Sequence, residues 1–337
     1  MERISSVMEE KEKRHHIGST FLGFLKNWTL PVAMSIGTVV YLIFAMTPQL
    51  ASASRFFEPI FNDILPLFMF LILFVTFCKV DFHQMRLEWW HFWISLFQIL
   101  FVLVVVAIIL FGIDDGDTEG KILWEGILCC IIGPCAAAAA VITTKLGGNL
   151  SSMTTYTFMS NFITALLIPT FFPLIEKSAH ITFLTAFWII LQRVVLILVV
   201  PLVMGWYVKH HMHRFHRRII SIPDLGFYLW GISLTIVTGT TVKNIVNSHS
   251  PVSLLGGIAA VSLLLCILQF AVGKYIGHFF QSTINAGQAL GQKNTAFAIW
   301  IAYTYLNPVA SVGPGCYILW QNIVNSWELW EQRKKER

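Results

Sequence analysis

The sequence has few charged residues. Only 12% of its 337 residues are Asp, Glu, Lys or Arg, whereas 56% are hydrophobic, and the mean hydropathy is +0.68. Soluble globular domains carry about 25% charged residues. The shortage of charge therefore excludes a soluble protein and predicts an all-α integral membrane protein.

The sequence also lacks the patterns that catalysis or metal binding would need. Its six cysteines lie in or beside apolar segments without metal-type spacing to histidine, and it has no HExxH motif and no nucleophile beside a base. We therefore expect no enzyme, no cofactor and no bound metal. The basic segment 209–218, KHHMHRFHRR, would suit a metal tract, but its composition favours a solvated cytoplasmic loop.

Long apolar runs dominate the rest of the chain. A run of about 20 apolar residues is long enough to cross a bilayer as a helix. The candidate spans are 28–47, 57–78, 89–112, 122–146, 151–175, 181–207, 226–243, 252–279, 282–305 and 307–330. Ten spans form the predicted architecture, and an even number places both termini on the same side of the membrane.

The distribution of basic residues supports this count. One side of the membrane would carry the basic residues of both terminal segments and of the 209–218 run, whereas the other would carry only Arg55, Lys121, Lys177 and Lys243. Cytoplasmic loops are enriched in Lys and Arg, so both termini are predicted to be cytoplasmic, in the plasma (inner) membrane. The net charge of +5 then reflects orientation in the membrane, and nucleic acid is not an expected partner.

Ten spans divide into two halves of five. An odd number of spans in each half inverts the second half relative to the first, which is a recurrent arrangement in transporters. The predicted divisions are a cytoplasmic segment 1–27, a first five-helix repeat 28–175, an inverted repeat 176–330 and a basic cytoplasmic tail 331–337.

The fourth span of each half contains residues that interrupt helices. The first has Gly133 and Pro134 ahead of a run of alanines, and the second, GQALGQKNTAFAIW at 287–300, has two glycines. Backbone breaks within a membrane occur only where protein or a water-filled cavity satisfies the freed groups. We therefore expect both spans to break, near 137–140 and 291–294, and to cross. The alternative is that the small residues only allow close helix packing.

Lys293 lies in the second of these spans, with no acidic residue nearby in the sequence. A lysine at the centre of a membrane helix costs roughly 3 kcal/mol, so it suggests a functional role. With about 11 residues on either side, its ammonium would be roughly 16 Å from either end of the span. A lysine that snorkels to the surface is the alternative, but the side chain is too short unless a cavity reaches inward.

The two interrupted spans carry a family resemblance. The chain resembles the bile acid:sodium symporter family, in which helix 4 carries P-G-G-T-x-S-N-V and helix 9 carries E-x-G-x-Q-N. The similar stretches here are PCAAAAAV at 134–141 and ALGQKN at 289–294, with further matches at Gln98, 147–157, 201–205 and 320–322. The resemblance implies ten helices, an inverted repeat, a core and a panel domain, and crossed discontinuous helices 4 and 9.

Most of the sodium ligands that the resemblance implies are missing. Ala139 and Ala140 replace the helix 4 Ser and Asn, Ala289 replaces the helix 9 carboxylate, and Met153 replaces a hydroxyl of helix 5. A hard cation needs several oxygen ligands. Sodium is therefore a doubtful partner.

Lys293 occupies the place of the family's helix 9 glutamine. Its ammonium is a compact charge with three donors, and we expect it to act as a tethered cation in place of sodium. Backbone carbonyls, Gln98, Gln292 and Thr157 are its candidate partners. The residues expected at the helix breaks are Pro134, Ala139, Ala140 and Gly291.

The expected substrate is a small organic anion, because two cations and no carboxylate lie near the middle of spans. Arg193, in the middle of the sixth span, would suit bidentate recognition of a carboxylate or sulfonate. It could equally bond to backbone carbonyls or to Gln192 as a structural element. The candidate substrate-binding residues are Asn294, Gln321, Asn322 and Arg193.

Together these features predict a secondary transporter of a bile-acid-like or carboxylate anion, working by alternating access without sodium. If Lys293 releases and regains a proton during the cycle, transport would be coupled to protons. The alternatives are a conventional sodium symporter with relocated ligands and a membrane sensor or scaffold that transports nothing.

Overall fold

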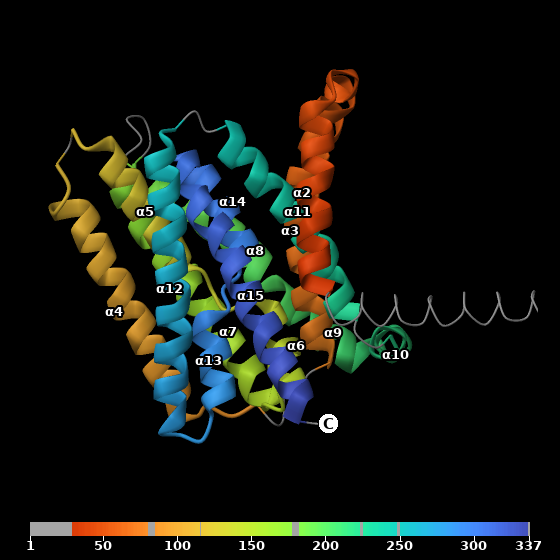
Figure 1. Ribbon diagram of the computed structural model, residues 1–337. Coiled ribbons are helices and arrows are strands. Elements are labelled where there is room, and N and C mark those ends of the chain that lie inside the picture. Colours follow the sequence, from red (N-terminus) through yellow and green to blue (C-terminus); the bar gives the residue numbers. More distant parts are fainter. Residues whose placement is uncertain are drawn as a thin grey trace, which may run out of the picture.

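The computed structural model describes residues 29–79, 85–114, 116–176, 182–222, 225–247 and 250–335. These residues form helices joined by short connections, with one isolated β-bridge (Figure 1). The N-terminal segment 1–27 lies outside the described residues. The helices are α2 (Thr29–Met46), α3 (Ala51–Lys79), α4 (Trp89–Phe111), α5 (Thr118–Ile132), α6 (Ala137–Lys145), α7 (Leu150–Ile175), α8 (Phe183–Leu198), α9 (Val200–His211), α10 (His213–Ile220), α11 (Leu225–Asn247), α12 (Val252–His278), α13 (Thr283–Gly291), α14 (Thr295–Tyr305) and α15 (Val312–Lys335), with the 3-10 turns η1 (Pro48–Leu50) and η3 (Pro308–Ser311).

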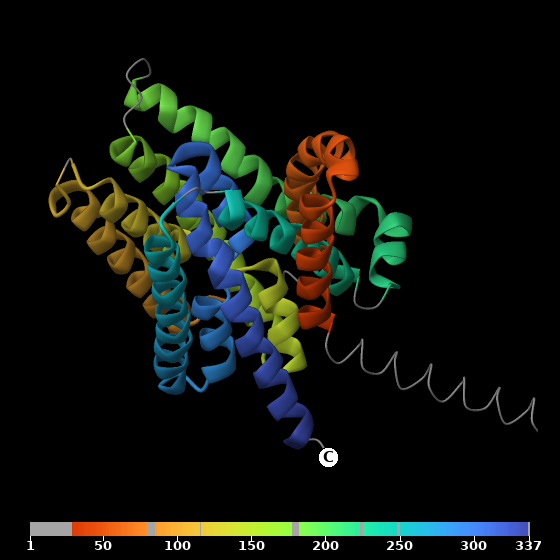
Figure 2. The same cartoon turned by 45° about the horizontal axis from the view of Figure 1, so that its top comes forward.

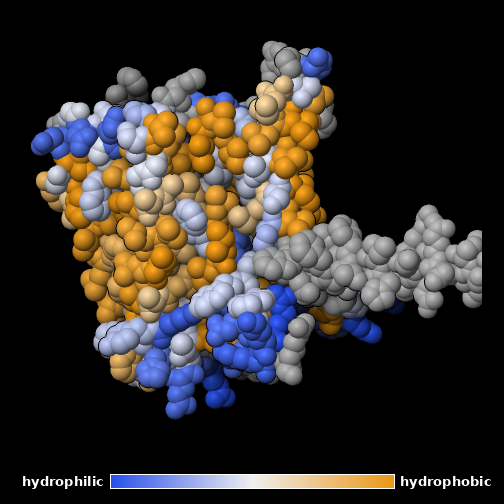
Figure 3. All heavy atoms as spheres, viewed as in Figure 1, coloured by the Kyte–Doolittle hydropathy of each residue, from blue (hydrophilic) through white to orange (hydrophobic). Residues whose placement is uncertain are grey.

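Four helices in the described part of the chain are long and apolar enough to cross a membrane: α4, α7, α11 and α12. Shorter apolar helices cover Pro31–Met46, Ile64–Lys79 and Phe183–Gln192. On the face drawn in Figure 3, hydrophobic residues surround the middle of the bundle and hydrophilic residues gather toward its ends. The prediction of an all-α membrane protein is confirmed, whereas the count of ten spans and the inverted repeat stay predictions.

The helices pack into two groups. In the core group α12 packs along α13 and against α15 and α5, and α4 packs against α5 and α7. In the panel group α2, α3 and α11 pack on one another, and α9 packs on α3. Figures 1 and 2 show α2, α3 and α11 on one side of α15, and α4, α5 and α12 on the other.

Both interrupted spans are broken. The second break, at 292–294 between α13 and α14, falls in the expected stretch. The first lies at 133–136, not at 137–140, so Ala139 and Ala140 are in the first turns of α6. The reason is local: Pro134 cannot continue the helical hydrogen bonds of α5, while alanine is the best helix former and starts α6 as soon as the chain allows.

The region around the sixth span also differs from expectation. The apolar run 181–207 is divided between α8 and α9 at Val199, two residues before Pro201. The prediction of a loop at 209–218 is wrong, because α9 continues to His211 and α10 follows it, although most of these residues are exposed as expected. Apolar residues spaced three or four apart give this basic segment the pattern of an amphipathic helix.

Candidate functional site

The two breaks meet inside the core group, and their backbones pair with each other. Cys135 and Lys293 form an antiparallel bridge. The amide of Ala136 donates to the carbonyl of Gln292 at 2.9 Å, and the amide of Asn294 donates to the carbonyl of Pro134 at 2.8 Å. We name residues 133–136 and 292–294 the crossover. Its two segments satisfy each other's backbone groups, as a buried helix break requires.

Side chains from neighbouring helices satisfy the carbonyls that the broken helices leave free. The amide nitrogen of Gln98 on α4 donates to the carbonyls of Ile131 and Gly133, each at 3.2 Å. The hydroxyl of Tyr317 on α15 donates to the carbonyl of Gly291 at 2.8 Å. The last carbonyls of a helix have no partner within it, so these side chains hold the ends of α5 and α13 in place.

Gln321 holds the backbone of Lys293 from α15. Its side-chain oxygen accepts from the Lys293 amide at 2.9 Å, and its side-chain nitrogen donates to the Lys293 carbonyl at 3.2 Å. Gln321 is itself buried. Both backbone groups of Lys293 are therefore fixed by one side chain, much as a neighbouring strand would fix them.

The side chain of Lys293 is buried inside the protein. The residue is 1% exposed, and its ammonium has no hydrogen-bond partner among the described residues. The neighbouring Gln292 is 0% exposed, and neither atom of its amide is paired within the described part of the chain. A lysine that snorkels would reach the surface, so this burial excludes that alternative. An unpaired buried charge is costly, which indicates that something other than stability retains it.

A small cavity of about 40 Å³ lies where the crossover meets the panel group. Panel helices α3 and α11 contribute Met69, Ile72, Trp230, Ser233, Leu234 and Val237 to its lining. The crossover, the starts of α6 and α14, and α15 contribute Ala136, Ala138, Lys293, Asn294, Thr295, Ala296, Ile318 and Gln321. Small-molecule sites measure about 300 to 1,000 Å³, so this cavity is too small to hold a molecule of that kind in the conformation described.

An apolar cluster of residues from α4, α6, α7 and α13 also packs against the crossover. Ala139, Ala140, Met153 and Ala289 are all fully buried and belong to one hydrophobic cluster. The other members of this apolar cluster are Trp90, Ile94, Cys135, Tyr156, Ala286 and Leu290. The resemblance implies sodium ligands at Ala139, Ala140, Met153 and Ala289. The structure brings these four positions together in apolar packing.

Two of the remaining candidates, Thr157 and Asn322, do not line the cavity. The Thr157 hydroxyl donates to the carbonyl of Met153 at 3.0 Å, and the Asn322 amide donates to the carbonyl of Ile318 at 2.7 Å. Asn294 both lines the cavity and starts α14, since its side-chain oxygen accepts from the Phe297 amide at 3.2 Å. The side chain of Arg193 lies outside the described residues. The structure thus gathers Lys293, Asn294 and Gln321, and the proposed roles of all these residues stay predictions.

Sequence reasoning missed several residues that support the crossover. Ser160 accepts from the Cys135 amide at 2.9 Å, and the Thr164 hydroxyl donates to the carbonyl of Ile132 at 3.1 Å. Both lie on α7, as does Thr157, and all three are buried. Their spacing of three and four residues puts these hydroxyls on one face of α7, and that stripe was the signal available in the sequence.

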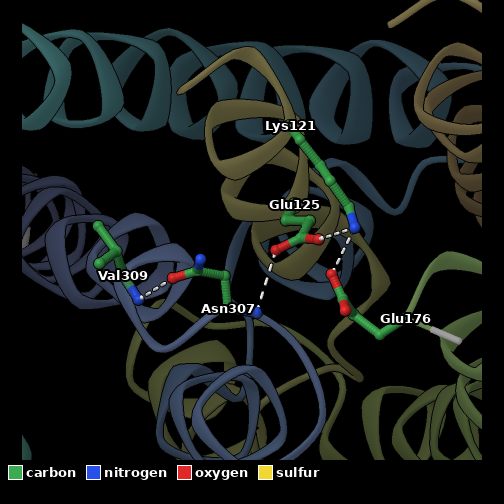
Figure 4. A network of polar contacts seen from close by, with 5 residues as sticks. All are labelled: Lys121, Glu125, Glu176, Asn307 and Val309. Atoms are coloured by element: carbon green, nitrogen blue, oxygen red, sulfur yellow. Dashed lines mark hydrogen bonds and ion pairs between the residues drawn. The ribbon is translucent and has the colours of Figure 1, made fainter. Parts of the chain in front are cut away.

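Charged networks close the core group at both ends. At the end away from the C-terminus, Lys121 lies 2.5 Å from Glu176 and 3.8 Å from the fully buried Glu125, whose other oxygen accepts from the Asn307 amide (Figure 4). This network joins the start of α5, the residue after α7 and the connection after α14.

At the other end, Lys274 of α12 forms an ion pair with Glu328 of α15. Gln288 of α13 donates to Glu328 at 2.8 Å and to Asn325 at 3.0 Å. The second broken span is therefore anchored on both sides of its break, α14 just beyond its outer end through Asn307 and α13 within its last turns through Gln288.

Two broken helices that meet within a bundle form the binding site in many secondary transporters. Comparison with known families agrees with that class. The profile of the sodium bile acid symporter family matches residues 66–248, which is more than half of the chain, and the chain belongs to this family. The match includes α5 and α6 but ends before α13 and α14. No curated protein matches the chain significantly. Members of this family are transporters and not enzymes, and the chain is an integral membrane protein.

Proposed function

We propose that the chain moves a small organic anion by alternating access and uses Lys293 as a covalently attached cation in place of sodium. The observation that carries the proposal is the contrast around the crossover. The four positions where the resemblance implies sodium ligands form part of one apolar cluster. The only ammonium at the crossover within the described residues belongs to Lys293, which is buried beside the cavity.

The chemistry of the cavity favours an anion. Lys293 provides a positive charge that the described residues leave unpaired, and Gln321 and Asn294 line the same cavity. An anion that enters this space would neutralise a charge whose burial is costly. A carboxylate or sulfonate with an apolar body matches both this charge and the apolar lining from α3 and α11.

The proposed architecture has ten spans in two inverted halves. The first half comprises α2, α3, α4, the α5–α6 pair and α7, and the second comprises α8–α9, α11, α12, the α13–α14 pair and α15. The broken pair is the fourth span in each half, which is the order that an inverted repeat produces. Both termini would then be cytoplasmic.

Alternating access would come from movement of the panel group against the core group. The core is tied at both ends by the Lys121 and Lys274 networks. One direct contact between the core and panel groups joins Lys145 on α6 to Phe227 on α11. The lysine ammonium lies 4.1 Å from the ring centre of the phenylalanine. Cation–π contacts at exposed sites are worth about 0.5 to 1 kcal/mol, so this contact can open and close during a transport cycle.

The test is counterflow in liposomes that contain the purified chain, with labelled taurocholate and a set of short carboxylates and sulfonates as probes. Replacing Lys293 by Gln should lower the rate for the best probe by about tenfold or more, because a charged hydrogen bond of about 1.5 to 3 kcal/mol is lost. Lys335→Gln removes the same charge from an exposed i,i+4 pair with Glu331 and should leave the rate unchanged.

Each other outcome has a clear meaning. A Lys293→Gln protein that transports as fast as wild type would contradict the role of the ammonium. A well-folded wild-type protein that moves none of the probes would favour the sensor or scaffold. Arg193→Gln belongs in the same assay, since weaker anion binding would assign that arginine to the substrate and unchanged binding would make it structural.

A further inference from the structure

We propose that the basic amphipathic helix α10 binds the phosphate headgroups of anionic phospholipids in the membrane leaflet that faces the C-terminal end of the bundle. This site is separate from the crossover and does not depend on the transport proposal. Three observations support the proposal: the charge of α10, the apolar residues on the other face of this helix, and the direction of the helix relative to the bundle.

The charge of this segment is large and unbalanced. Arg214, Arg217 and Arg218 are exposed and lie three and four residues apart, so they share one face of α10. The described residues form no ion pair with these three arginines. In the sequence, no acidic residue occurs between Glu176 and Asp224. Among the described residues, nothing therefore competes with anions from outside the protein for this face.

The other face of α10 is apolar and only partly covered. Ile219 is buried in a cluster with Phe74, Val75, Cys78 and Val208. Phe215, one turn before Ile219 on α10, and Ile222, just beyond the end of the helix, remain 46% exposed each. Large apolar side chains beside an arginine face are the combination found in helices that lie in the membrane interface.

The position of α10 matches that role. In Figure 1 it is seen nearly end-on while α12 and α15 run along the picture, so α10 lies across the long helices. His216 donates to the carbonyl of Cys78 at 2.7 Å, and Lys79 donates to the carbonyl of Ile222 at 3.2 Å. These contacts hold α10 at the end of α3, where a membrane span would meet the headgroup layer.

Arginine is well suited to this ligand, because its planar group binds phosphate through two parallel hydrogen bonds. Each basic residue near an anionic surface contributes about fivefold in binding. Lipid supplies both the phosphate and the apolar boundary that Phe215 would enter, whereas a dissolved phosphate supplies only the first.

The test uses the purified full chain, equilibrated in mixed micelles with equal amounts of phosphatidylglycerol and phosphatidylcholine and then washed. Retained lipid is counted by mass spectrometry. Wild type should retain phosphatidylglycerol in clear excess. The triple variant Arg214→Gln, Arg217→Gln, Arg218→Gln should lose this excess by about tenfold or more. If that variant does not fold, Arg217→Gln alone should show about a fivefold loss.

The matched control removes three charges elsewhere at the same end of the bundle, through Arg333→Gln, Lys334→Gln and Lys335→Gln. These residues lie at the end of α15, where Lys334 already covers Trp330 and Lys335 pairs with Glu331. The control should retain phosphatidylglycerol as wild type does. Equal losses in both triple variants would overturn the site, and so would full retention in the α10 variant.

Two further arms separate the sources of phosphate. Phe215→Ser keeps all three arginines and should weaken phosphatidylglycerol retention by about fivefold or more, because an aromatic anchor is lost from the acyl boundary. Inorganic phosphate at millimolar concentration should not displace the lipid. Full retention by Phe215→Ser, together with displacement by phosphate, would make α10 a plain anion site and contradict the lipid assignment.

Discussion

The two sides of the crossover bury different kinds of residues. Toward α4 and α7, the first turns of α6 and the end of α13 pack into an apolar cluster that includes Ala139 and Ala289. Toward α3 and α11, the same backbone presents Lys293 and Asn294 to a cavity. The difference teaches that the four positions where the resemblance implies sodium ligands are now ordinary apolar packing, while the cavity side keeps a buried lysine whose unpaired charge is costly.

This comparison gives a prediction for the apolar side. Ala139→Asp would place a carboxylate in the centre of the cluster, where Ala139 is 0% exposed. An unpaired buried charge should destabilise the protein by about 3 kcal/mol or more, which would appear as a large drop in the thermal unfolding midpoint. Added sodium should not restore the midpoint, because few oxygen ligands surround this position. Recovery in sodium would reveal an ion site and break the comparison.

On the cavity side of the crossover, we expect a substitution to lower transport without lowering stability. Lys293→Met replaces an unpaired ammonium by an apolar side chain of similar length, so the thermal midpoint should stay the same or rise, by up to about 3 kcal/mol in stability. Counterflow should nevertheless fall about tenfold or more. A variant that loses stability together with transport would show that Lys293 holds the crossover together and has no separate role in transport.

Thr157 allows a smaller test of the apolar side. Its hydroxyl donates to the carbonyl of Met153 in the preceding turn of α7. Such a bond within one helix contributes little, so Thr157→Val should change stability by about 1 kcal/mol or less and leave counterflow as it is. Loss of sodium-dependent transport in this variant would instead identify the hydroxyl as an ion ligand.

Much of the site follows from the sequence because its signals are local. Lys293 stands in a long apolar run, and glycine or proline near each break already predicts interrupted helices. The first break lies at 133–136, earlier than predicted, because the high helix propensity of alanine favours starting α6 near the beginning of the alanine run. Close packing also fixes Gly291, where a Cβ atom would lie 2.3 Å from the Phe270 ring, and no local pattern shows this.

The remaining features depend on contacts between distant residues. The hydrogen bonds between Gln321 and Lys293 join α15 to the crossover across 28 positions in the sequence. The hydrogen bond from Gln98 to Gly133 spans 35 positions. No spacing rule relates such pairs. The basic helix α10 was missed for another reason, since its high density of charge obscured the apolar residues that repeat every three or four positions.

The most direct test of the central claim is the initial rate of anion uptake by wild-type protein in liposomes, measured with sodium and with sodium fully replaced by N-methylglucamine, at several pH values. We predict the same rate in both solutions, because the ammonium of Lys293 is proposed to take the place of sodium. A pH dependence that disappears in Lys293→Gln would assign the coupling to protons, and pH-independent uptake would indicate a uniporter or exchanger. Uptake that requires sodium would contradict the account.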